Sequence, residues 1–234
     1  MALIEVRSLV KNYGGLRPPR IRELAVEAGE VVVIGGPDER AAAVLSDLLT
    51  GATLPDEGEV TVAGRSTASL GSPEDWLAFL DRLGLVNPRI VLLDQLTVGQ
   101  NLAVALTLDV DPMSPDTRSA VAGMAARVGL APAELDLPLP AASPLARFRL
   151  RVGRALAHGP AVLLVEHPTL DLARDDVAQA ARLIRDVGAG RERAAIVVSG
   201  DPGILGRAAT RGLTWRPATG ELLAASRWPR WLRL

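Results

Sequence analysis

The chain has 234 residues, enough for one ordinary domain or for one domain with a small inserted lobe. It contains no cysteine and only two histidines, His158 and His167, which excludes thiolate zinc sites, iron–sulfur clusters, disulfides and histidine-rich metal sites. The formal net charge of -1 gives no reason to expect a nucleic-acid partner. Lys11 is the one lysine among 26 basic residues, so any mechanism that needs a lysine elsewhere is excluded.

The N-terminus and the length of the apolar runs indicate in which cellular compartment the protein works. The N-terminus lacks a charged start followed by a long apolar stretch, so it does not have the pattern of a signal peptide. No apolar run approaches the roughly 18 residues that a membrane helix needs. We therefore expect a cytosolic protein that meets a membrane only through a partner.

The first half of the chain shows one strand pattern and two helix patterns. The apolar run at residues 31–34 does not alternate, which predicts a strand buried on both faces, as in a parallel sheet. Ser72 and Pro73 have the pattern of an N-cap and first turn, and they predict a helix through Leu83. Ser114 opens a second helix, whose inward positions are Val121, Met124, Ala125 and Val128.

The second half continues with a helix whose apolar stripe consists of Leu145, Phe148, Val152 and Ala155. Four arginines lie mostly off this stripe and indicate a solvated face: Arg147, Arg149, Arg151 and Arg154. Runs at 162–165 and 194–198 predict two more buried strands, with a helix between them from about Asp175 to Val187.

This order of elements predicts an α/β core with a helical insertion. We expect the strands near residues 31–35, 162–166 and 194–199 to run parallel. A mostly helical lobe should cover about residues 88–150.

Several short motifs follow one another along the chain. A strand, a glycine-containing turn and a helix span Gly29 to Gly51, and a PDxGEVxVxG hairpin follows at 55–64. Leu96–Asn101 reads LTVGQN, Arg154–Pro160 reads RALAHGP, and Val162–Thr169 reads VLLVEHPT. Together these segments resemble the nucleotide-binding domain of ATP-binding cassette (ABC) transporters over roughly residues 3–222. Among subfamilies, the chain looks most like Mla-type lipid-transport ATPases.

The resemblance implies a P-loop NTPase-like ABC ATPase fold of class α/β. This fold has a parallel core sheet, an N-terminal antiparallel β subdomain and an inserted helical subdomain. The implied domain covers residues 1–224, with the helical subdomain at about 88–150, and a tail at 225–234 follows it.

The segment at the phosphate-loop position departs from the family pattern. It consists of Gly36, Pro37, Asp38, Glu39, Arg40, Ala41, Ala42 and Ala43. A working loop needs glycines, a lysine for the phosphates and a hydroxyl for Mg²⁺, but the last three positions are all alanine. A carboxylate about 4 Å from a phosphate charge costs about 4 kcal/mol at an effective dielectric of 20, and two acidic residues lie inside this loop. Arg40 would have to reach a phosphate past both of them.

The other family positions are also altered. Pro88 stands at the glutamine-loop position, Glu166 at the Walker B aspartate, His167 at the catalytic glutamate and Gly200 at the switch histidine. Tyr13 falls where the family stacks an aromatic ring on adenine. The signature LSGGQ is replaced by Ala142, Ser143, Pro144, Leu145 and Ala146, of which only the serine matches.

Two interpretations are open at three of these positions. His167 is either a replacement general base or a tolerated polar residue at a strand end, and the second is favoured because no triphosphate is expected beside it. Glu166 is either a magnesium ligand or a plain sheet-end carboxylate, and neither Ala43 nor Pro88 supplies a second ligand. Tyr13 either stacks on adenine or packs in the core or a turn.

The leading hypothesis is a degenerate ABC subunit, a pseudo-ATPase that acts as structural or regulatory partner of a membrane permease, of a competent ABC ATPase, or of both. No intact catalytic residue, metal, cofactor or nucleic-acid partner is expected, and a homo- or heterodimer is plausible. By resemblance, the surface around the glutamine loop receives the coupling helix of a permease, next to Leu96–Asn101. One alternative is a weakly active ATPase that uses Mg-ATP with Arg40, Glu166 and His167. Another is a soluble scaffold.

The C-terminal tail, residues 225–234, holds two of the four tryptophans and three arginines. Tryptophan and arginine are enriched at interface hot spots. Pro229 and the short length disfavour an amphipathic helix. Tryptophan and arginine also suit a membrane–water boundary. We expect the tail to contact a protein partner in preference to lipid, with folding back onto its own domain as the alternative.

Overall fold

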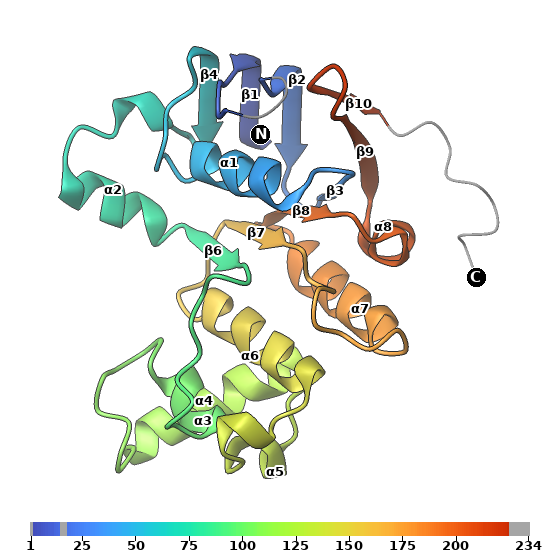
Figure 1. The fold of residues 1–234 in the computed structure, drawn as a ribbon. Helices are drawn as coiled ribbons and strands as arrows, with labels where there is room; N and C mark the ends of the chain where they lie inside the picture. The colour runs from blue at the N-terminus through green and yellow to red at the C-terminus, as the bar shows by residue number, and fades with distance from the viewer. Residues whose placement is uncertain (1, 15–17, 225–234) are drawn as a thin grey trace.

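The computed structural model describes residues 2–14 and 18–224 of the chain, so the C-terminal tail lies outside the described residues. Over the described part, ten strands form one sheet in the order β5-β4-β1-β2-β10-β9-β3-β8-β7-β6 (Figure 1). The strands are β1 (Ala2–Val10), β2 (Arg20–Glu27), β3 (Val31–Gly35), β4 (Glu57–Val62), β5 (Arg65–Ser66), β6 (Leu83–Val86), β7 (Val162–Glu166), β8 (Ala194–Ser199), β9 (Arg211–Arg216) and β10 (Glu221–Ala224).

The strands from β9 to β6 run parallel, and the other end of the sheet is mostly antiparallel. In the parallel part, Val33 pairs with Val197 and Leu164 pairs with Ile196. Every residue of β3, β7 and β8 is buried, as expected for strands covered on both faces. The prediction that these three strands run parallel is confirmed. At the other end, β1 pairs antiparallel with both β2 and β4.

The helices divide between the two faces and one lobe (Figure 1). They are α1 (Glu39–Leu49), α2 (Pro73–Leu80), α3 (Val98–Ala103), α4 (Pro115–Val128), α5 (Pro132–Leu135), α6 (Pro144–Leu156), α7 (Val177–Gly188) and α8 (Pro202–Ala208), with 3₁₀ turns η1 (Thr67–Ser69) and η2 (Leu139–Ala141). Helices α3 to α6 lie between β6 and β7 in the chain, which is the helical insertion that the sequence predicts.

Alternating side chains of β3 supply two hydrophobic cores. Val31 and Val33 belong to the core that contains α3, α4, α6, α7 and α8. Val32 and Ile34 belong to the core that contains α1 and the antiparallel strands. Successive side chains of a strand point to opposite faces, so this short strand joins both cores.

The helix patterns are largely confirmed by burial. Val121, Ala125 and Val128 are buried on α4, and Ser114 caps it by accepting a hydrogen bond from the Thr117 N–H. The helix predicted for 175–187 is α7, with its apolar stripe buried as expected.

The prediction that α2 extends through Leu83 is wrong. The helix begins at Pro73, after the N-cap Ser72, but it ends at Leu80. Leu83 instead opens β6 and pairs with Val162 of β7. The short edge strand has an apolar composition that also suits a helix, and pairing with β7 decides between the two.

The prediction of a solvated arginine face on α6 is also wrong. All four side chains are partly buried, and each has a partner on another segment. Arg147 donates to the Pro140 carbonyl oxygen at 3.0 Å, and Arg149 donates to Gln179 Oε1 at 3.1 Å. The Arg151 guanidinium lies 4.0 Å from Asp171 Oδ2, and Arg154 donates to the Val91 carbonyl oxygen at 3.0 Å. Burial lowers the pKa of Arg151 and of Arg154. These arginines therefore fasten α6 to its neighbours.

Across residues 2–14 and 18–224, the structure contains no helix with both the length and the apolar character required to span a membrane.

Because β6 and α6 lie in close contact, we expect a larger side chain between them to lower the stability of the protein. A Cβ on Gly84 would lie 2.6 Å from the Ala155 carbonyl oxygen, so Gly84→Ala should force the strand away from the helix. We expect a loss of about 1–3 kcal/mol in the free energy of unfolding, measured by urea denaturation. Gly71→Ala is the matched control, because a Cβ there meets nothing within 4 Å. Equal stability of the two variants would contradict the prediction.

Candidate functional site

The carboxyl ends of the parallel strands bring most of the predicted positions to one edge of the sheet. Gly36 follows β3, Glu166 ends β7, Gly200 follows β8, and Pro88 lies two residues after β6. A cavity of about 20 Å³ lies between β7 and α6, and its lining includes Pro88, Pro144, Glu166 and His167. This is room for about one water molecule. The sheet thus assembles the predicted positions but leaves little space between these four.

The phosphate-loop segment forms a helical turn. Gly36 has a positive φ of 93°, and α1 then begins at Glu39 with Asp38 as its N-cap. The Asp38 carboxylate accepts a hydrogen bond from the Ala41 N–H at 2.8 Å, and the Asp38 carbonyl oxygen accepts one from the Ala42 N–H at 2.9 Å. A phosphate loop presents such N–H groups to its ligand. Here both already have acceptors within the chain.

The side chains that replace the last glycine and the lysine face the protein interior. Ala41 is 3% exposed and Ala42 is fully buried, both in the core beneath α1. Ala43 is half-buried and carries no hydroxyl. The segment therefore offers phosphate neither a cation nor a metal ligand at these three positions.

Tyr13 faces a cation of the same chain. The guanidinium carbon of Arg40 lies 5.8 Å from the centroid of the Tyr13 ring, a cation–π distance. The ring is half-buried and packs against the core beneath α1. Arg40 is therefore directed at the predicted adenine platform.

The single lysine, Lys11, follows β1 and forms an ion pair. Lys11 Nζ lies 2.9 Å from Asp56 Oδ1, and the Asn12 N–H donates to the other carboxylate oxygen at 2.6 Å. Hydrogen bonds from the Asn12 backbone and from Lys11 lower the pKa of Asp56. Lys11 thus has a carboxylate partner at the start of β4.

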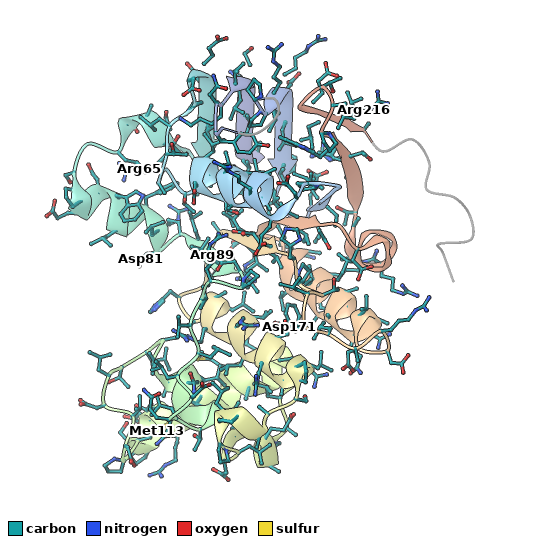
Figure 2. The ribbon with its side chains drawn as sticks, in the orientation of Figure 1. Arg65, Asp81, Arg89, Met113, Asp171 and Arg216 are labelled. Atoms are coloured by element: carbon teal, nitrogen blue, oxygen red, sulfur yellow. The ribbon has the colours of Figure 1, made fainter. Side chains whose placement is uncertain are left out.

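Glu166 forms an ion pair that the motif analysis missed. Its Oε1 lies 2.7 Å from Nη2 of Arg89, the residue after Pro88. The carboxylate side chain is 3% exposed, whereas the Arg89 side chain is 50% exposed. Figure 2 shows Arg89 at the end of β6, between the sheet and the helical lobe. The carboxylate at the Walker B position therefore already faces a positive charge.

His167 has an unusual backbone and an unpartnered ring atom. Its φ is +43°, which is uncommon for a residue other than glycine. Its N–H donates to the Val198 carbonyl oxygen at 2.8 Å, which fastens the end of β7 to β8. Its Nε2 is buried and has no hydrogen-bond partner among the described residues. Among residues 2–14 and 18–224, no group of three or more His, Asp or Glu side chains is placed to hold a metal ion.

Gly200 is exposed just beyond β8 and supplies no side chain at the switch position. A Cβ there would meet nothing within 4 Å, so the space for a larger residue exists.

The signature segment caps α6. Ser143 is the N-cap, and its hydroxyl accepts a hydrogen bond from the Ala146 N–H at 3.1 Å. Pro144 follows at the first helical position and has no N–H to donate. Leu145 and Ala146 are buried, as is Ala142 before the cap. The segment therefore uses its one matching hydroxyl within its own helix.

The sheet topology, the helical insertion and the order of these positions along the chain define an ABC nucleotide-binding domain. The chain is 30% identical over 203 residues to the lipoprotein-releasing system ATP-binding protein LolD of Alcanivorax borkumensis, covering 85% of this chain and 88% of that protein. It therefore belongs to the family of ABC transporter ATP-binding proteins. The ABC transporter ATP-binding protein YxdL of Bacillus subtilis is 26% identical, with coverage of 86% and 78%. No protein-family model matches the chain.

Solved structures show the same fold. CbiO1 of Clostridium perfringens, described as part of the ABC transporter complex CbiONQ, superposes with a TM-score of 0.78 at 20% identity, over 95% of this chain and 87% of that one. The dimeric bacterial ABC transporter cassette MJ0796 gives 0.74 at 21% identity, over 96% and 100%. The predicted fold class, with its antiparallel β part and helical insertion, is confirmed.

The Asp38 cap predicts a stability effect. Asp38→Ala removes the acceptor of the Ala41 N–H and should lower the free energy of unfolding by about 1 kcal/mol, measured by urea denaturation. Asp38→Asn is the matched control, because asparagine also caps helices while removing the charge, and it should stay close to the wild type. A wild-type stability for Asp38→Ala would show that the cap does not hold this turn.

Proposed function

We propose that this chain is a pseudo-ATPase subunit of an ABC transporter, which keeps the family fold and its docking surfaces but does not bind or hydrolyse ATP efficiently. The observation that carries the proposal is the first turn of α1, where the Ala41 and Ala42 N–H groups are already bonded to Asp38. Phosphate would have to break this cap before it could accept the same hydrogen bonds.

Electrostatics supports the same conclusion. Asp38 and Glu39 place two carboxylates at the start of α1, and one of them about 4 Å from a phosphate charge costs about 4 kcal/mol at an effective dielectric of 20. This amount alone corresponds to nearly a thousandfold in affinity. A magnesium ion at Glu166 would also have to displace the guanidinium of Arg89, which lies 2.7 Å from the carboxylate.

The proposed partner is a membrane permease, because this is how the chain's family works and because CbiO1 is described as part of a transporter complex. A groove of about 280 Å³ lies between β6 and α6, and its apolar lining includes Leu80, Leu85, Ile90 and Ala105. A short amphipathic helix on the cytoplasmic side of a permease suits it, since apolar residues at helical spacing fill such grooves. The chain would then lie in the cytoplasm, peripheral on the inner face of the membrane.

The second proposed partner is another ABC subunit, and MJ0796 has been solved as a dimer. In family dimers, each site combines the phosphate loop of one subunit with the signature of the other. This chain alters both elements, one through Asp38 and the other through Pro144. A homodimer would therefore carry two altered sites, and a heterodimer with a competent ATPase would carry one altered loop and one altered signature.

The nucleotide prediction is that calorimetry detects no saturable binding of Mg-ATP at millimolar concentration, and that phosphate release does not exceed background. A competent ABC ATPase measured alongside serves as the positive control. Ala42→Lys should not restore hydrolysis, because His167 and Gly200 still replace the catalytic and switch residues, and it places a lysine in a buried position. A dissociation constant in the micromolar range for the wild type would overturn the proposal in favour of a weakly active ATPase.

The partner prediction is that the tagged full chain purifies from native membranes together with a polytopic membrane protein, identified by mass spectrometry. Deleting residues 226–234 should weaken this recovery and leave the melting temperature of the isolated chain nearly unchanged. Recovery only from the soluble fraction would instead support the scaffold alternative. A large fall in melting temperature with recovery intact would show that the tail belongs to the domain's own core.

A further inference from the structure

Residues 87–93 connect the last parallel strand to the helical lobe, and we refer to them as the 87–93 segment. The segment leaves β6 after Val86 and reaches the turn before α3. Ile90 lines the proposed permease groove, and the neighbouring Val91 is 71% exposed. The conformation of this segment therefore sets the position of Ile90 in the groove.

The beginning of the segment is held on the parallel sheet. Arg89 Nη2 lies 2.7 Å from Glu166 Oε1, and the carboxylate is almost fully buried at the end of β7. The Asn87 side chain accepts hydrogen bonds from the N–H groups of Arg89 (3.0 Å) and Ile90 (3.1 Å), which turns the chain so that Arg89 reaches Glu166. Exposed ion pairs stabilise little, but a buried carboxylate is costly to leave unpaired.

The end of the segment is held on the helical lobe. Arg154 of α6 donates to the Val91 carbonyl oxygen at 3.0 Å. The fully buried Asn101 of α3 accepts from the Leu93 N–H at 2.9 Å and donates to the Leu93 carbonyl oxygen at 3.0 Å. The two lobes are thus linked through a segment with specific side-chain contacts at both ends.

We propose that Arg89 is a built-in cation that takes over the role of a metal ion at Glu166 and fixes the 87–93 segment, so that the groove has its shape without nucleotide or metal. Arg89 is a positioning residue: it acts on the groove through the turn that carries Ile90 and Val91. The proposal deepens the proposed function on which it rests, because a subunit without nucleotide must hold its docking surface by its own contacts. Arginine suits this role because its guanidinium stays protonated and binds carboxylates with fixed geometry.

Amide hydrogen exchange by NMR on the full chain, without metal or nucleotide, tests the proposal. Arg89→Ala should speed exchange at Ile90 by about tenfold or more, because the turn loses its contact with Glu166. Exchange at Leu93 should change much less, because that amide is held by Asn101 of α3, outside the segment, whereas the Ile90 amide is held by Asn87 within it. Glu166→Gln should reproduce the effect in part, since it removes the charge and keeps the shape, and Arg89→Lys should lie between wild type and Arg89→Ala.

The matched control is Arg65→Ala, which removes a half-buried ion pair to Asp75 of α2, away from this site (Figure 2). It should leave exchange at Ile90 unchanged. Unchanged exchange at Ile90 in Arg89→Ala would overturn the proposal. A uniform rise in exchange rates that includes the buried amides of β8 would also overturn it, since it would show general destabilisation instead of a local release. If Arg89→Ala does not fold, Arg89→Lys and Glu166→Gln repeat the comparison.

Adding Mg-ATP to the wild type separates this proposal from the proposed function. If exchange at Ile90 is slow without ligand and does not respond to Mg-ATP, both proposals are supported. Protection that appears only with Mg-ATP would overturn the Arg89 proposal and the pseudo-ATPase together. Saturable Mg-ATP binding with a strong effect of Arg89→Ala in its absence would overturn the pseudo-ATPase alone.

Discussion

The parallel register of β3, β8, β7 and β6 is the constraint on which the rest of the structure depends. Because these strands end at one edge, segments from four distant parts of the chain meet there: the first turn of α1, the 87–93 segment, the Glu166–His167 pair and Gly200. In open sheets with parallel strands, ligands bind at this edge. The same geometry places acidic and basic side chains of this chain close enough to satisfy one another.

Three contacts within the chain involve residues at or beside the predicted nucleotide-binding positions. Arg40 faces the Tyr13 ring, Asp38 caps the turn that would hold phosphate, and Arg89 pairs with the Walker B carboxylate. Each contact arises at a position where the sequence departs from the family pattern, or directly beside one. In the proposed function these contacts inside the chain stand in place of ligand contacts, and they support the pseudo-ATPase proposal more strongly than a missing lysine alone.

The α/β core with its helical insertion was predictable from local patterns, because buried strands such as 162–165 and capped helices such as the one after Ser114 carry strong local signals. The antiparallel β subdomain followed from the family resemblance. The extent of α2 was not predictable, since Leu83–Val86 becomes a strand only by pairing with β7. The candidate positions followed from the family spacing. Arg89 was missed because its partner lies 77 residues away in the chain. A charged residue directly after the glutamine-loop position was the one local signal for it. Gln179 and Val91, the partners of Arg149 and Arg154, lie 30 and 63 residues away and were hidden for the same reason.

The substitutions at the phosphate loop and the signature share a physical property. Alanine favours the helix interior, aspartate favours the N-cap, and proline favours the first helical position, so Ala41, Ala42, Asp38 and Pro144 each suit the helix in which they lie. Glycine-rich loops, in contrast, give up local stability so that the backbone can approach a ligand. Active sites generally sacrifice stability in this way. A chain whose residues at these positions all agree with local helix preference has the local stability that a working phosphate site gives up. It also keeps the core and the groove that is the proposed docking site of the permease.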